Sequence, residues 1–261
     1  MALRPQEREA AERGITTSIL RLAPFTIRFV PTARSAAKKR PAAKFPRQSA
    51  KARRARAEEI TQKLRAAYPD ARCALDHHSP FQLLVATILS AQATDKGVNK
   101  VTPVLFRRYP TPHDLAEAPP DEVKTIIKTT GFFNNKAKSI QGAARKLDLE
   151  FAGRVPDTMP ELLTLPGVAR KTANVVLGTA FGKNEGVVVD THVARLSKRL
   201  GLTAQTDPVK IEQDLMILVP RDDWTMFSHL LIFHGRLCCF AQRPQCARCP
   251  VNELCPSAFK V

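Results

Sequence analysis

Four cysteines lie close together in the last part of the sequence. Cys239, Cys246, Cys249 and Cys255 leave six, two and five residues between them. Thiolates gathered this tightly can hold a metal, and four cysteines are the common ligand set of both a 4Fe-4S cluster and structural zinc. Structural zinc usually takes its cysteines from two separated knuckles, whereas one loop supplies all four here. The spacing therefore favours a 4Fe-4S cluster, with zinc or disulfides as the alternatives.

Two more cysteines, Cys73 and Cys238, are left over. Cys238 adjoins the first of the four and could substitute for it as a ligand. Its neighbours on the helix predicted for residues 223–238 are apolar, so we interpret it as a packed thiol. The basic character of the chain suggests a reducing environment, which disfavours disulfides.

Residues 157–182, DTMPELLTLPGVARKTANVVLGTAFG, predict two short helices joined by a few residues. Thr158 and Glu161 have the spacing of a capping box that opens the first helix, and Pro166 and Gly167 end it. The second helix has its apolar residues on one face, namely Ala173, Val176, Leu177, Ala180 and Phe181. We interpret the segment as a helix-hairpin-helix, with an ordinary αα-corner as the alternative.

The turn of such a hairpin, with the start of its second helix, points backbone N–H groups outward. These donors form a natural site for a phosphate oxygen. Hairpins of this kind usually carry a second glycine where this sequence has Ala169. At a positive φ the methyl group would cost about 1 kcal/mol or more, so we expect a helical φ at Ala169.

Lys171 and Asp190 are ionisable residues at or just before the starts of predicted helices in and after the hairpin. Lys171 lies in the first turn of the second helix, where the positive end of the helix dipole disfavours an ammonium and so favours a nucleophilic amine. A lysine there is otherwise a phosphate contact or a solvated charge. Asp190 follows the apolar run VVV and precedes a predicted helix, so capping that helix is its simplest role.

The elements that position these residues are predicted to be helical. With 11 glycines, 2 tyrosines and apolar residues mostly at helical spacing, the composition argues against an all-β sandwich or barrel. The segment 80–92 carries one apolar stripe, formed by Phe81, Leu84, Val85, Ile88 and Leu89. No apolar run approaches the roughly 18 residues that would cross a bilayer. We therefore expect a soluble, all-α protein without a membrane partner.

Proline and glycine separate the other predicted helices. One begins near Ala55 and stops at Pro69, and the rest span residues 95–108, 120–129, 135–149, 191–200, 208–219 and 223–238. Asp207 before Pro208 has the pattern of an N-cap followed by a first-turn proline.

The charge of the chain points to nucleic acid as its partner. There are 41 basic and 24 acidic residues, a net charge of +17, which attracts phosphate backbones. Residues 1–57 hold 15 of the basic and 3 of the acidic side chains, and so contribute +12 of that charge. We interpret residues 1–54 as a basic, disordered arm. An organelle-targeting segment or a start assigned too far upstream are the alternatives.

The motifs together resemble one family. LSAQATD at 89–95, KTIIKTTGFFNNKA at 124–137, LPGVARKTANVV, VDTH and the six-two-five cysteine loop occur in this order. In this the chain resembles endonuclease III, a family of bifunctional DNA glycosylases in the helix-hairpin-helix superfamily. The resemblance runs from about Ala55 to Lys260.

The resemblance implies two helical domains with DNA in the cleft between them. A six-helix barrel would span residues 78–187 and include the helix-hairpin-helix. Residues 55–77 and 188–261 would form the domain of the 4Fe-4S cluster, held by Cys239, Cys246, Cys249 and Cys255.

The resemblance also implies roles in catalysis. The amine of Lys171 would attack C1′ of the damaged nucleotide and form a Schiff base, and β-elimination would then cut the strand. Asp190 would stabilise positive charge that develops at C1′ and assist proton transfers. His192 belongs to the same VDTH motif. It would either contact DNA or be a buried imidazole whose hydrogen bonds are made within the protein.

The remaining implied residues bind DNA. Gln92 and Phe132 would fill the space that an extruded base leaves, although core packing is the alternative for Phe132 and its neighbour Phe133. The backbone contacts would come from Lys136, from the amides of the hairpin turn and from the cluster loop. The hairpin residues are Gly167, Val168, Ala169, Arg170 and Lys171, and the loop residue is Arg243.

The expected activity is removal of oxidised pyrimidines from duplex DNA, with strand cleavage at abasic sites. Adenine-specific and mismatch-specific glycosylases usually lack the lysine at position 171, and the helix from Phe81 to Gln92 has no carboxylate of the kind expected in an adenine glycosylase. A non-catalytic DNA-binding module is the alternative from another class. We expect a monomer that works on nucleoid DNA in a bacterial cytoplasm.

Overall fold

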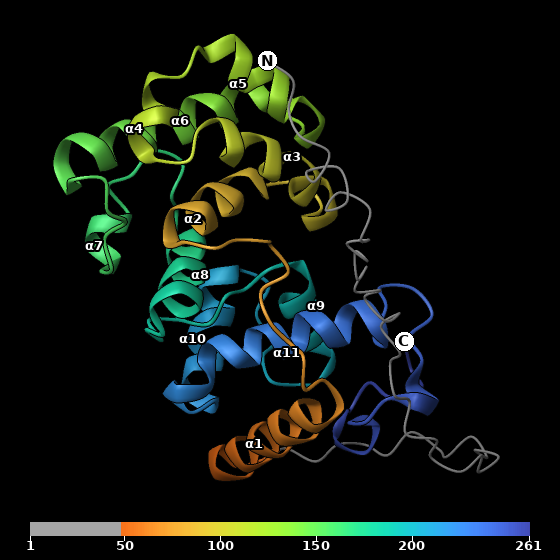
Figure 1. Cartoon of the computed structure of the whole chain (residues 1–261). Coiled ribbons are helices and arrows are strands. Elements are labelled where there is room, and N and C mark those ends of the chain that lie inside the picture. The colour runs from red at the N-terminus through yellow and green to blue at the C-terminus, as the bar shows by residue number, and fades with distance from the viewer. Residues whose placement is uncertain (1–47) are drawn as a thin grey trace, which may run out of the picture. The chain divides into compact units, whose positions relative to one another are not determined.

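The computed structural model describes residues 48–261, and this part of the chain is helical without a strand (Figure 1). The α-helices are α1 Ala50–Ala67, α2 Pro80–Leu89, α3 Asp95–Arg108, α4 Pro112–Glu117, α5 Pro120–Ile127, α6 Phe133–Phe151, α7 Met159–Leu162, α8 Arg170–Phe181, α9 Thr191–Arg199, α10 Pro208–Leu218 and α11 Trp224–Leu237. Short 3-10 turns are η2 Lys128–Thr130, η3 Arg221–Asp223, η4 Cys246–Arg248 and η5 Asn252–Leu254. None of the described helices is long and apolar enough to cross a membrane.

Helix α1 begins earlier than its sequence pattern indicates. The Ser49 hydroxyl accepts from the Ala52 amide and starts the helix at Ala50, so a disordered arm reaching residue 54 is wrong at its end. Arg53 and Arg56 donate to the carbonyls of Leu202 and Leu200, just beyond α9. These long-range bonds stabilise a first turn that has no apolar periodicity of its own. The rest of the predicted arm, residues 1–47, lies outside the described part.

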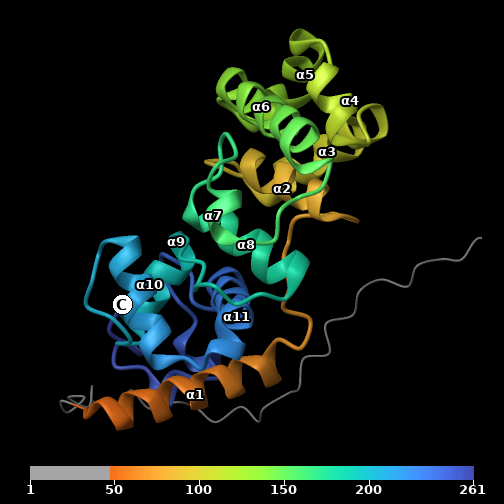
Figure 2. The same ribbon diagram turned by 90° about the vertical axis from the view of Figure 1, so that its left-hand side faces the viewer.

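Helix α2 is more deeply buried than a single apolar stripe predicts. All five stripe residues are buried, but so are Leu83, Ala86 and Thr87 on its other sides. The helix contacts α3, α6 and α8, and lies among them in Figure 2. It ends at Leu89 and not at residue 92, which leaves Gln92 in the following loop.

Two capping predictions had different outcomes. Asp207 caps α10 as expected, with its carboxylate accepting from the Lys210 amide at 3.0 Å. The capping box predicted at Thr158 and Glu161 is absent, because the Thr158 hydroxyl donates to the Glu161 carboxylate instead of accepting from the backbone. A complete capping box opens the short helix α4, at Thr111, which the sequence reasoning missed.

The buried apolar residues form two separate clusters. The first runs from Leu75 to Leu177 and contains side chains of α2 to α8. The second contains residues from 57–71 and from 187–251, so that α1 packs with α9, α10 and α11. Contacts between α8 and α11 join the two halves, and a Cβ added at Gly178 would lie 2.1 Å from the Thr225 hydroxyl oxygen. The flanking segments of the chain therefore share one core.

Candidate functional site: a hairpin, a wedge loop and a cysteine cavity

The hairpin turn lies tightly against two helices of the first cluster. Gly167 has φ +78°, and a Cβ added there would be 2.6 Å from the Ser139 Cβ of α6 and 3.3 Å from the Ile88 side chain of α2. Leu162 and Leu165 on its N-terminal side are buried. The turn thus requires glycine both for its backbone conformation and for the space it occupies.

Ala169 is extended, with φ −101° and ψ 171°, so the expected helical φ is wrong. The residue is the N-cap of α8, a position that takes extended backbone. Its φ is negative, and the methyl group is accommodated without strain. Because an alanine has no side-chain oxygen, it leaves the first amides of α8 without a side-chain cap, as anion binding requires.

Lys171 is the second residue of α8 and is exposed to solvent. Its neighbour Arg170 is held in place by a carboxylate of α10: the Nε atom of Arg170 lies 3.0 Å from Glu212 Oε2. Glu212 is buried and also accepts from the Asn174 amide at 2.9 Å. This network ties the first turn of α8 to the second half of the molecule, leaving the Lys171 side chain free to project.

Asp190 is the N-cap of α9, as predicted. One carboxylate oxygen accepts from the Val193 amide at 2.7 Å, and the side chain is partly exposed. His192 is partly buried, and burial lowers its pKa, so the ring is neutral at physiological pH. Its Nδ1 lies 3.3 Å from a guanidinium nitrogen of Arg195, which also donates to the Cys239 carbonyl. His192 is therefore linked to the cysteine loop and does not project freely.

Gln92 and Phe132 share a rare backbone conformation. Both are exposed, and their φ values of 51° and 48° lie in the left-handed region, which non-glycine residues seldom adopt. Phe132 is 65% exposed, whereas Phe133 packs against the first cluster. Core packing of Phe132, the alternative in the sequence analysis, is excluded. Strained residues of this kind cluster at ligand contacts.

Lys136 does not lie where an exposed phosphate contact would. It is 5% exposed, and its Nζ donates to the Thr130 carbonyl at 2.7 Å. Burial lowers its pKa. The amide of Lys136 also donates to the Phe132 carbonyl, so this residue holds the loop before α6 at two points. The prediction that its side chain binds DNA is wrong, because the amine is already used inside the protein.

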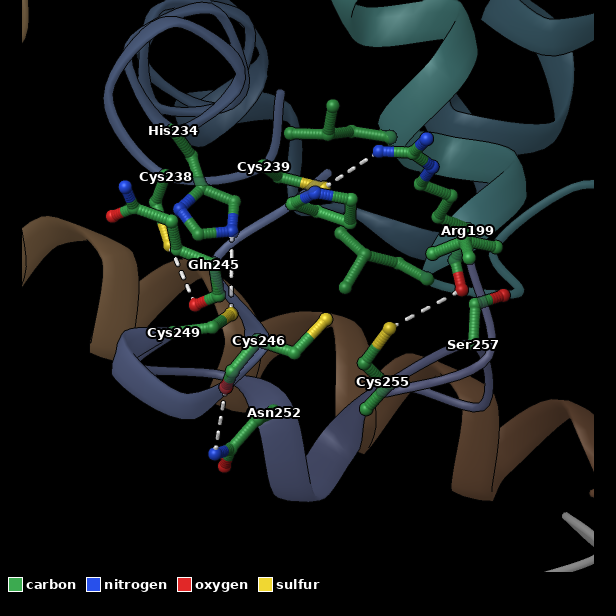
Figure 3. A pocket seen from close by; sticks show the side chains of 15 residues that line it. Arg199, His234, Cys238, Cys239, Gln245, Cys246, Cys249, Asn252, Cys255 and Ser257 are labelled. Carbon is green, nitrogen blue, oxygen red and sulfur yellow. Dashed lines mark hydrogen bonds between the residues drawn. The ribbon is translucent and has the colours of Figure 1, made fainter. Parts of the chain in front are cut away.

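The four predicted cysteine ligands line one cavity (Figure 3). The rest of the wall includes apolar side chains of Leu196, Leu200, Pro244 and Ala258. Cys238 and the polar side chains of Arg199, His234, Gln245, Asn252 and Ser257 also line it. A pocket in which the four predicted ligands converge beside hydrogen-bond donors fits a 4Fe-4S cluster, for which cysteine sulfurs are the natural ligands. Within the loop 239–255 only Val251 is buried, so the loop has little apolar core of its own.

Two family models match the chain. Residues 85–221 match the HhH-GPD superfamily of base excision DNA repair proteins, and residues 239–255 match the iron-sulfur binding domain of endonuclease III. Endonuclease III of Synechocystis is 61% identical over 203 residues, which cover 78% of this chain and 93% of that protein. The chain belongs to the endonuclease III family.

Further relatives agree with this placement. Endonuclease III of Escherichia coli K12 is 42% identical over 78% of this chain and 96% of its own length. Among solved structures, a non-covalent endonuclease III–DNA complex matches with a TM-score of 0.75 and 44% identity, covering 79% of this chain and 97% of that one. A trapped endonuclease III–DNA covalent intermediate matches with the same TM-score and 43% identity.

This member of the family is thus a DNA glycosylase and abasic-site lyase of base excision repair, and it binds DNA. It has the all-helical fold of the family and carries a 4Fe-4S cluster. Cys239, Cys246, Cys249 and Cys255 are the residues that would hold the cluster as thiolates, and bound there it would stabilise the loop 239–255. Side chains next to these cysteines would orient the thiolate sulfurs and donate to them.

Several side chains around the cysteines were not found by sequence reasoning. A guanidinium nitrogen of Arg199 lies 3.3 Å from Cys239 Sγ and also donates to the carbonyl of Phe240. His234 Nε2 lies 3.4 Å from Cys249 Sγ. Arg199 lies 40 residues before Cys239, so no local signal marks it. His234 lies five residues before Cys239, and this spacing was the signal that could have found it. Cys238 is buried, as expected of a packed thiol, but it lines the same cavity.

Two further basic residues differ in their surroundings. Arg243 is exposed in the cysteine loop, with φ 52°, as a contact with DNA would require. Arg236 of α11 forms an ion pair with Asp95, 2.5 Å between its Nη2 and the carboxylate Oδ2. Asp95 follows the loop that carries Gln92, so this pair joins that loop to the half that contains the cysteines.

Proposed function

We propose that Lys171 is the nucleophile of this enzyme. The observation that carries the proposal is its position on an uncapped helix start, exposed, one residue beyond the ion-paired Arg170. Its nitrogen bonds to C1′ as the bond to the damaged base breaks and the base leaves with the electron pair and a proton. The C1′–O4′ bond of the resulting aminal then breaks, O4′ takes up a proton, and the C1′–nitrogen double bond of a Schiff base forms. The Schiff base loses a proton from C2′, and the 3′ phosphate departs.

Asp190 supports this chemistry through its charge. Its carboxylate is fixed by the Val193 amide at the start of α9, next to the positive end of the helix dipole. An anion held there stabilises positive charge at C1′ in the transition state. The carboxylate can also accept the protons that move in the following steps.

The loops with Gln92 and Phe132 open the duplex in this proposal. Their exposed, left-handed residues project from ends of α2 and α6 that are firmly packed. Phe132 stacks where the base has left, and Gln92 faces the remaining partner base. The amides of Gly167 to Lys171 bind a backbone phosphate, and Arg243 adds a contact from the cysteine loop.

The preferred substrate is an oxidised pyrimidine in duplex DNA, handled by a monomer on nucleoid DNA in a bacterial cytoplasm. The residues from Phe81 to Leu89 form a buried apolar helix without a carboxylate, which disfavours an adenine glycosylase. A thermostable thymine-DNA glycosylase shares the fold at 23% identity and a TM-score of 0.70, and at that identity the likeness extends to fold alone.

The two apolar clusters support a division into two domains. The first cluster falls within residues 75–177 and the second takes residues from both flanks. The limits predicted at 78 and 188 shift slightly, because Leu75 packs in the first cluster and Val187 in the second. We therefore assign residues 75–186 to the barrel and residues 48–74 with 187–261 to the cluster domain. In this arrangement Lys171 and Asp190 lie near the joint between the domains, on α8 and before α9.

Borohydride trapping on abasic DNA tests the nucleophile. Wild-type protein should form a covalent adduct, and Lys171→Gln should form none. The matched control is Lys210→Gln, because Lys210 is also an exposed lysine in a first helical turn, on α10. Trapping of Lys171→Gln at the wild-type yield would assign the reaction to another amine.

The same substitution at two N-cap aspartates distinguishes the catalytic role of Asp190 from its role in helix capping. Asp190→Asn keeps the capping oxygen and removes the charge, so single-turnover cleavage should fall about 10²- to 10³-fold while abasic-site binding survives. Asp207→Asn makes the same change at the N-cap of α10 and should leave the rate unaltered. Equal rates for both variants would contradict the proposed role.

A further inference from the structure

A chain of side chains leads from the end of α1 to one of the cluster cysteines. The hydroxyl of Tyr68, at the C-cap of α1, lies 2.9 Å from Nδ1 of His234. The other ring nitrogen of His234, Nε2, lies 3.4 Å from Cys249 Sγ. Figure 3 shows the imidazole directed at Cys249 from α11. Tyr68 and Cys249 are far apart in the chain, and only the fold brings them to opposite sides of one ring.

The protonation of the ring follows from what each neighbour can do. His234 is 1% exposed, and a charged imidazole at such a site would be costly, so the ring carries one N–H. A cysteine bound to iron is a thiolate, which accepts hydrogen bonds and has no proton to donate. The N–H of His234 must then be on Nε2, facing Cys249. Nδ1 is left as an acceptor, and the Tyr68 hydroxyl is the donor that it meets.

We propose that Tyr68 and His234 form a relay that fixes one tautomer of His234 and thereby directs an N–H···S hydrogen bond to Cys249 of the cluster. The inference rests on the proposed cluster ligands. Tyr68 and His234 act as positioning residues, since neither binds iron. The relay makes the electronic environment of the cluster depend on α1, a segment more than 160 residues before the cysteine loop.

An N–H donor affects a cluster sulfur in two ways. Reduction adds negative charge that the sulfurs share, so a hydrogen bond stabilises the reduced cluster more than the oxidised one and raises the reduction potential. The same bond keeps the thiolate in place against loss of the metal. Arg199 provides a comparable donor to Cys239, and His234 supplies the one to Cys249, on a different part of the loop.

The test uses two tyrosines that differ only in what they contact. Tyr68→Phe removes the hydroxyl that selects the tautomer. Tyr109→Phe is the matched control, since its hydroxyl donates to Glu122 at 2.7 Å and the residue packs in the first apolar cluster. In the loaded proteins, Tyr68→Phe should lower the reduction potential of the cluster and speed its loss to an iron chelator about 10-fold. Tyr109→Phe should match the wild type in both measurements.

A second set of measurements addresses His234 directly. His234→Leu should lower the reduction potential of the cluster more than Tyr68→Phe does. His234→Gln, which retains an N–H donor, should have a potential between those of His234→Leu and the wild type. ¹⁵N NMR of histidine-labelled, cluster-loaded protein should show His234 protonated on Nε2 in the wild type, and a mixture of tautomers in Tyr68→Phe.

The outcomes separate this inference from the cluster assignment. A wild-type protein without four irons and four sulfides per chain would overturn the assignment itself. A fully loaded protein in which Tyr68→Phe has the potential and the chelation rate of Tyr109→Phe would overturn the relay, as would an Nδ1-protonated His234 in the wild type.

Discussion

The hairpin turn and the cysteine loop both present chemistry from irregular backbone, but they are held by different means. The hairpin is flanked by buried Leu162 and Leu165, and Gly167 lies against α2 and α6 with no room for a methyl group. The cysteine loop has one buried residue, Val251, between Cys239 and Cys255. The hairpin thus owes its shape to the protein core, whereas the cysteine loop is held by hydrogen bonds within its backbone and from Arg195 and Arg199 to its carbonyls.

The difference corresponds to what each region binds. A hairpin that offers backbone amides to a phosphate must have its geometry before the DNA arrives, because adjusting it would cost binding energy. A loop that supplies four thiolates can take its final shape with the cluster, and the free energy of metal binding then stabilises it. Rigidity is therefore expected in the hairpin with or without metal, and in the cysteine loop only with it.

Loss of a cluster ligand should have the largest effect on this contrast. In Cys246→Ser the cluster should be lost, and amide exchange in residues 239–255 should accelerate about 100-fold or more. Exchange in the hairpin, residues 159–170, should stay as in the wild type. Cys238→Ala is the control, because Cys238 lines the cavity without being a predicted ligand. The iron and sulfide content of this variant should equal that of the wild type. If the amides of residues 239–255 exchange slowly in metal-free protein, the cysteine loop is rigid without its cluster, and the proposed difference from the hairpin is wrong.

A methyl group placed in the hairpin tests the other side of the comparison. Gly167→Ala adds left-handed strain and an overlap with Ser139, together about 2–4 kcal/mol of unfolding free energy. Gly182→Ala, at φ +65° with nothing within 4 Å of the added Cβ, should cost only about 1 kcal/mol. Denaturant unfolding measures both. Equal losses would mean that the close packing of the turn contributes nothing.

Substitution of Lys136 tests whether its buried amine holds the loop that carries Phe132. In Lys136→Met the lost bond to Thr130 and the relieved burial of charge oppose each other, so the unfolding free energy should change by less than about 2 kcal/mol. Base extrusion, followed by 2-aminopurine fluorescence, should nevertheless weaken because Phe132 is no longer held. Lys138→Met, exposed on the same helix, should behave as wild type. Unchanged fluorescence in Lys136→Met would remove Lys136 from the positioning of the wedge.

The smallest effect is expected from residues 1–47, which belong to neither region. They carry 11 basic and 3 acidic side chains. Their deletion, which spares Arg53 and Arg56, should weaken binding to damaged and undamaged duplex alike. The slope of the logarithm of the binding constant against the logarithm of the salt concentration should become less steep by about 0.9 for each phosphate contact that is lost. The rate of single-turnover cleavage at saturating protein should not change. An unaltered salt slope would mean that this segment does not contact DNA, and the targeting or upstream-start interpretation would take its place.

Much of the site was predictable because its signals are local. Helical spacing marked the buried face of α2, and the residues before α9 and α10 predicted the Asp190 and Asp207 caps. Cysteine spacing predicted the cluster, and Pro166 with Gly167 predicted the turn. Each of these patterns is a relation between residues a few positions apart, which the sequence displays directly.

The sequence by itself therefore determined the helices, the hairpin and the identity of the chemical groups, while the tertiary structure decided which polar side chains remain available. Lys136 and Lys171 both lie in the first turn of a helix, yet one amine is buried on a carbonyl and the other projects into solvent. The packing of the first part of α1 and the direction of His234 were equally undetermined, because Arg53 bonds to Leu202 and Tyr68 to His234, each pair more than 140 residues apart. Local periodicity specifies which face of a helix is apolar, but burial of a polar group depends on the partner that the fold brings to it.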